Sequence, residues 1–96
     1  MTSRELERQK NAFKNQVDRV INNYRDAMSK VSNIDKTFQN SDDTILRSIV
    51  DNNNKEIIKS ISDFISKAES LEASIISKTN EKIAELKKQE DEENDE

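Results

Sequence analysis

The chain of 96 residues contains no glycine and no proline, the two residues that most often end helices and form turns. Any turn must therefore use Asn, Ser and Asp, which tolerate the left-handed conformation at a helix end or cap the next helix. Near the middle of the chain, Phe38, Asn40, Ser41 and Asp42 supply such a segment. The sequence therefore predicts an all-α fold, an antiparallel hairpin of two long helices with its turn near residues 39–43.

Apolar residues before the turn follow alternating steps of three and four, the pattern of a helix that buries one stripe against a neighbour. The members of this stripe are Phe13, Val17, Val20, Tyr24, Ala27, Val31, Ile34 and Phe38. Lys10 takes one polar position of the stripe, and Ile21 and Met28 widen it. The width favours packing against more than one neighbouring helix.

A second apolar stripe follows the turn, with a mean step close to that of a straight helix. It comprises Leu46, Val50, Asn53, Ile57, Ile61, Phe64, Ala68, Leu71, Ile75, Thr79, Ile83 and Leu86. The run Asn52–Asn54 consists of poor helix formers. It is interpreted as a polar patch within one continuous helix, and the alternative is a break at which Asn54 caps a third helix.

The expected boundaries follow from capping signals and charge. Thr2 and Glu5 have the spacing of a capping box, so the first helix should run over about 3–39. A turn at about 40–42 and a helix over about 43–88 complete a single hairpin domain, residues 1–88. Residues 89–96 carry six acids and no base, and this self-repelling run is expected to be a disordered tail.

Composition narrows the classes of function. There is no His and no Cys, which removes the commonest proton-transfer and metal-ligating side chains, and phosphate-binding loops need glycine. We therefore expect a protein that is not an enzyme and that has no cofactor, metal site or catalytic residue. Without the acidic tail the 16 bases face 14 acids, so no basic stripe for nucleic acid is expected.

The apolar content also bears on membranes and on partners. The longest apolar runs are pairs such as Ile57-Ile58, so no membrane insertion is expected, and the first residues lack the apolar segment of a cleaved signal peptide. Only 31% of the residues are hydrophobic and 38% are charged, which suits helices with one buried stripe each. Such a pair should complete a helical bundle with itself or with a partner.

In length and predicted architecture the chain resembles the WXG100 superfamily, the small helical-hairpin proteins of type VII secretion systems. The central turn of that family carries Trp-x-Gly, and the matching place here reads Phe38, Gln39, Asn40. The resemblance covers residues 3–88. The chain resembles most the divergent members of the superfamily that accompany LXG-type toxins as targeting partners. It implies an adaptor that binds a toxin's helical N-terminal domain or a second small hairpin. The family's export signal, an aromatic residue followed four residues later by an acid, is not found beyond the second helix, so a partner would have to supply it.

Two hypotheses remain open. The first is a helical adaptor or chaperone-like protein that binds a helical partner; the second is an intracellular structural or regulatory coiled-coil module, such as a phage or mobile-element protein, antitoxin or scaffold, acting as a homodimer. In the second, Lys10 and Asn53 would set the register. The expected location is the cytoplasm, with export without a cleaved signal peptide as the alternative. In both, the residues expected to form the core or the partner-binding stripe are Phe13, Val17, Val20, Tyr24, Val31, Phe38, Val50, Ile57, Ile61, Phe64, Leu71 and Ile75.

Overall fold

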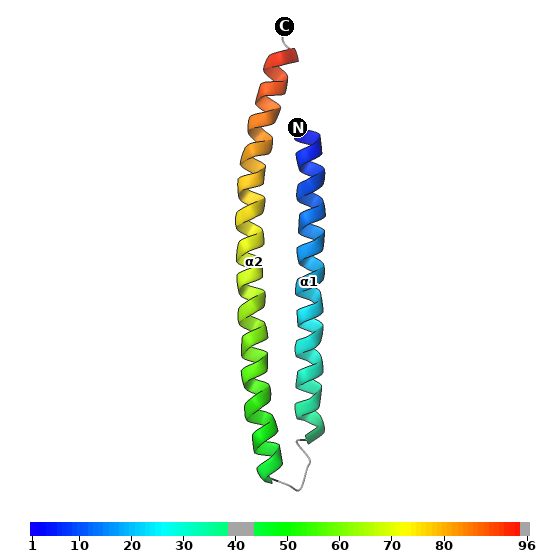
Figure 1. The fold of residues 1–96 in the computed structure, drawn as a ribbon, viewed down its shortest axis with the longest axis vertical. Helices are drawn as coiled ribbons and strands as arrows, with labels where there is room; N and C mark the ends of the chain where they lie inside the picture. Colours follow the sequence, from blue (N-terminus) through cyan, green and yellow to red (C-terminus); the bar gives the residue numbers. More distant parts are fainter. Residues whose placement is uncertain (39–43, 95–96) are drawn as a thin grey trace.

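The structure, a computed structural model, describes residues 1–38 and 44–94. Two helices make up this part of the chain, α1 (Ser3–Phe38) and α2 (Thr44–Asn94). They run side by side in opposite directions along an elongated molecule of 80 × 15 × 13 Å (Figure 1). The predicted all-α antiparallel hairpin is confirmed.

The predicted ends of the helices are close to the observed ones on either side of the turn. α1 ends at Phe38, and the other predicted turn residues, Asn40, Ser41 and Asp42, lie outside the described residues. At the other end of α1, the Thr2 hydroxyl accepts a hydrogen bond from the Glu5 backbone N–H (3.2 Å), as the predicted cap requires.

α2 runs without interruption through Asn52–Asn54, so the alternative of a third helix is wrong. Asn54 is buried, and its side-chain Nδ2 donates a hydrogen bond to the backbone oxygen of Val31 on α1 (3.3 Å). Asn53, which the sequence placed in the stripe, is exposed instead. A polar group that is buried with a partner costs little, which explains how a poor helix former is accommodated inside a long helix.

The predicted disordered tail is also wrong for residues 89–94, which continue α2. Glu90 accepts two hydrogen bonds from the start of α1, one from the Ser3 backbone N–H (2.8 Å) and one from the Ser3 hydroxyl (2.7 Å). The first N–H groups of a helix have no partner within the helix, and a carboxylate is favoured there by the helix dipole. These two bonds lower the pKa of Glu90. A contact between the two ends of the chain thus outweighs the local charge repulsion.

The contact between the helices forms a narrow seam. Its α2 side follows steps of three and four almost throughout, and its members are Arg47, Asp51, Asn54, Ile58, Ile61, Ile65, Ala68, Glu72, Ile76, Thr79, Ile83, Leu86 and Glu90, all buried or half-buried. Ile21, Ile65 and Ile83 are the deepest apolar side chains of the described residues, with 4%, 7% and 4% exposed. Val20, predicted as core, is 43% exposed, because α1 turns its neighbour Ile21 toward α2.

Replacement of Ile65 by Ala is expected to lower the free energy of unfolding by about 2–4 kcal/mol, because it leaves a cavity in the seam. The same truncation of Leu71, which is 61% exposed, should cost less than about 1 kcal/mol. Urea denaturation followed by circular dichroism compares the two variants. Equal losses would contradict the assignment of the seam.

Deletion of residues 89–96 is expected to destabilise the hairpin, whereas deletion of residues 91–96 should have little effect. Only the longer deletion removes Glu90, the acceptor for Ser3. Thermal unfolding of the two truncated proteins and the full chain measures the difference. If both deletions lowered the melting temperature equally, the bonds to Glu90 would not be what holds this end together.

Candidate functional site

One lateral face of the hairpin carries two rows of apolar residues, and we call it the apolar face. Its row on α1 consists of Phe13, Val20, Ala27 and Ile34, and its row on α2 consists of Val50, Ile57, Phe64 and Leu71. Within each row the members are seven residues apart, so they lie in a line along one side of the helix. Of the eight residues three positions before them, seven are buried or half-buried and form part of the seam, whereas Tyr24 is 38% exposed.

The two rows lie on the same side of the molecule. Tyr24, which lies between Val20 and Ala27 in sequence, packs its ring against Phe64 of the α2 row, with the ring centroids 4.4 Å apart and the planes at 36°. Offset and tilted ring pairs of this kind are favourable contacts. The pair therefore joins the rows into a single surface across the two helices.

Much of this surface is uncovered in the hairpin. Val20, Ile34, Ile57, Phe64 and Leu71 all have between 43% and 61% of their surface exposed. The other three row members are half-buried. Because contiguous exposed apolar side chains are a common feature of binding surfaces, the apolar face is the candidate site.

The opposite lateral face is charged. Arg25 forms an ion pair with Glu69 across the two helices, and Lys14 pairs with Asp18 along α1 (2.8 Å). Arg25 directly follows Tyr24, and consecutive residues of a helix point about 100° apart, so these pairs lie on the other side of the seam. We call this the charged face.

Two carboxyl groups meet on the charged face, Asp18 of α1 and Glu72 of α2. The Oε2 atom of Glu72 is buried and has no hydrogen-bond partner in the part of the chain that the structure describes. Its burial, followed by its hydrogen bond with Asp18, raises the pKa of Glu72. The hydrogen bond from Lys14, followed by that from Glu72, lowers the pKa of Asp18. The opposite shifts are those expected when a protonated Glu72 donates a hydrogen bond to the Asp18 carboxylate, a bond that would also satisfy the buried Oε2 atom.

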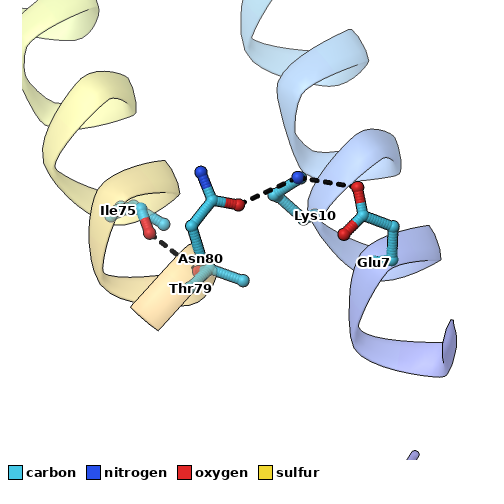
Figure 2. A network of polar contacts seen from close by, with 5 residues as sticks. All are labelled: Glu7, Lys10, Ile75, Thr79 and Asn80. Atoms are coloured by element: carbon cyan, nitrogen blue, oxygen red, sulfur yellow. Dashed lines mark hydrogen bonds and ion pairs between the residues drawn. The ribbon is translucent and has the colours of Figure 1, made fainter. Parts of the chain in front are cut away.

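A polar network joins the helices near the start of α1 (Figure 2). Lys10 of α1 donates hydrogen bonds to Glu7 (2.8 Å) and, across the seam, to the side-chain oxygen of Asn80 on α2 (2.9 Å). The hydrogen bond from Lys10 lowers the pKa of Glu7. Lys10 therefore occupies a polar position of the seam, as its place in the predicted stripe suggested, and its partner is a residue that the sequence pattern did not single out.

The predicted core and partner-binding residues divide between the seam and the apolar face. Val17, Val31, Ile61 and Ile75 are half-buried, whereas Val20, Tyr24, Ile57, Phe64 and Leu71 are exposed and half-buried Phe13 and Val50 belong to the rows. Phe38 ends α1, and its side chain lies outside the described part. Sequence reasoning missed the seam positions of Asn54, Glu72 and Glu90. A strict alternation of steps of three and four through Ile58 and Ile65 includes Asn54 and Glu72, but it does not reach Glu90, because two steps of four follow each other at Ala68, Glu72 and Ile76.

Other kinds of site find little support in the described residues. In residues 1–38 and 44–94, no group of three or more acidic side chains is placed to hold a metal ion. In the same part of the chain, neither helix has a stretch long and apolar enough to cross a membrane.

No protein-family model matches this chain, and neither a curated protein nor a solved structure shows significant similarity to it.

Replacement of Glu72 by Gln is expected to stabilise the hairpin at about pH 7, because the amide can donate to Asp18 without first binding a proton. A raised pKa means that the contribution of Glu72 is complete below its ordinary pKa of 4.5 and is lost as the pH rises through the higher pKa of the folded state. Asp18, with its lowered pKa, loses its contribution only as the pH falls below its ordinary 3.8.

The advantage of Glu72→Gln should therefore be small near pH 4 and larger near pH 7, as measured by thermal unfolding. Glu81→Gln, an exposed substitution with the same charge change, serves as the control. If the difference in melting temperature between Glu72→Gln and the wild type did not change with pH, a proton shared between Glu72 and Asp18 would be contradicted.

Proposed function

We propose that this hairpin is a non-enzymatic protein-binding module, an adaptor that contributes its two helices to a bundle completed by a helical partner. The observation that carries the proposal is the apolar face, with its two rows joined by the Tyr24–Phe64 contact. Helical bundles are built by such stripes, in which apolar residues at regular spacing pack between the side chains of the facing helix.

The energetics support the same proposal. Covering the exposed part of one side chain of this size stabilises by about 1 kcal/mol. The five exposed row members together therefore offer on the order of 5 kcal/mol, a large fraction of the net stability of a small domain. The seam itself buries only three apolar side chains deeply among the described residues. A hairpin with so thin a core gains more from a partner than a domain with a full core does.

Within this proposal, the chain acts as a targeting or accessory factor in type VII secretion, where it would guide a toxin with a helical N-terminal domain. The support is the hairpin architecture, together with the resemblance of Phe38, Gln39 and Asn40 to the central segment of the WXG100 superfamily. An adaptor of this kind needs a binding surface and no catalytic group.

Placing Asp at both Ile57 and Leu71 is expected to weaken partner binding by at least about 100-fold, because two charges would have to be buried without partners. The tagged wild type and the variant are used to isolate partners from the native host, from both cells and culture supernatant, with mass spectrometry as the readout. A stoichiometric helical protein should be recovered with the wild type and lost with the variant.

The matched control places Asp at Ser62 and Ser66, which are exposed on α2 away from the rows. This control should retain the partner, and circular dichroism verifies that both variants are helical. Retention of the partner by the variant with Asp at Ile57 and Leu71 would overturn the assignment of the apolar face.

A further inference from the structure

The residues that border the apolar rows include lysines but no acid. Each lies three positions after a row member, on the outer side of its helix, and all eight are exposed: Gln16, Asn23, Lys30, Thr37, Asn53, Ser60, Lys67 and Ser74. Two are lysines and six are uncharged. Lys78 extends the α2 row by one further step of seven and is also exposed, and Glu81, three positions after it, is the first acid on this border. The apolar face therefore carries cations and neutral polar groups but no acid over residues 13–37 and 50–78.

Acids are plentiful elsewhere in the same two spans. Eight Asp and Glu residues occur there, and none falls in a row or on a border. Asp18, Glu69 and Glu72 belong to the charged face or the seam, while Asp26 lies beyond the border, where it pairs with Lys30 along α1 (3.1 Å). Nine bases and eight acids occur in these two spans, so the positive character of the apolar face results from where the acids lie and not from a large excess of bases.

This distribution discriminates between possible occupants. Two copies of the chain placed face to face would bring Lys30, Lys67 and Lys78 of both copies into one interface, where Glu81 at the end of the α2 row is the only acid on the border. Like charges at an interface oppose association. A membrane surface suits helices whose polar side is rich in Lys and Arg, whereas six of the eight border residues here are uncharged. A helix with an apolar stripe and acidic flanks suits this face, because the stripe can pack on the apolar rows while the acids pair with the lysines.

We propose that the occupant of the apolar face is a helix or helical pair of a different protein, with apolar residues at seven-residue spacing and Asp or Glu on both flanks of that stripe. This inference rests on the proposed function, which supplies the contact between helices. It adds the chemistry of the partner, because Lys30, Lys67 and Lys78 select acidic flanks and disfavour a second copy.

The test uses a charge-reversed copy of the chain as the probe, with Lys30→Glu, Lys67→Glu and Lys78→Glu. This probe keeps both apolar rows and presents the acidic border that the proposal requires. Sedimentation velocity of the wild type, of the probe and of their mixture, each at about 50 µM, measures association. We expect the mixture to form a one-to-one complex at least about 10-fold more tightly than either protein associates with itself. Added salt should weaken this complex, because the border is exposed.

Two controls separate charge from other effects. A copy with Lys36→Glu, Lys59→Glu and Lys88→Glu has the same net charge as the probe but changes exposed lysines outside the rows and borders, and it should not bind the wild type. The probe with the additional substitution Leu71→Asp should also fail to bind, since the apolar row is then interrupted.

Each other outcome overturns the inference. Self-association of the wild type as tight as that of the mixture would identify a second copy as the occupant, and the proposal of a helix-binding face would survive. Binding of the wild type to vesicles of anionic phosphatidylglycerol, with no complex in the mixture, would identify a membrane surface. A mixture that stays monomeric without vesicle binding would remove the charge selectivity, and the host experiment with Ile57 and Leu71 would then decide the proposed function separately.

Discussion

The seam between α1 and α2 is the interaction on which the rest of this structure depends. Two helices can cover only one side of each other, so the core is a single line of contacts in which Ile21, Ile65 and Ile83 are the deepest apolar members among the described residues. Such a line gives a hairpin few ways to fix its register by packing alone. The alignment of the two helices must therefore be fixed by contacts that are more specific than apolar packing.

Polar contacts across the seam supply that specificity. Ser3 with Glu90, Lys10 with Asn80, and Asn54 with the Val31 carbonyl are spread along the hairpin and each joins the two helices. A shift of either helix by one residue would remove these contacts. For the buried residues Ser3 and Asn54 it would leave polar groups unsatisfied, at a cost of about 1–3 kcal/mol each. In coiled coils single polar residues in the core set the register in the same way. In the seam, polar contacts thus replace part of the apolar burial and define the alignment of the two helices.

The alignment decides what the lateral faces present. With Ile21 turned toward α2, Val20 and the other row members lie on one side, while Arg25, Asp18 and their partners lie on the other. One face has apolar rows with a border of neutral residues and lysines, and the opposite face has ion pairs. The first is suited to the proposed partner and the second to water. The proposed binding function is a consequence of this rotation of the helices about their own axes.

The sequence by itself determined the hairpin. Without Gly and Pro, the segment from Phe38 to Asp42 is the one best suited to turn the chain, and the spacing of apolar residues on each side of it is helical. Both are local properties of the sequence. The sequence also identified the two apolar stripes, one with Val17 and Tyr24 and the other with Ile57 and Phe64. Periodicity could not tell which half of each stripe faces the other helix, since a wide stripe fits several rotations equally well.

Only the tertiary structure decided that rotation. It also decided that Asn54 is buried against α1 while Asn53 is exposed, and that α2 continues through residues 89–94. The physical reason is the same in each case. The deciding contacts join distant parts of the chain, 87 residues apart for Ser3 and Glu90 and 23 for Val31 and Asn54, and no local pattern encodes such pairs.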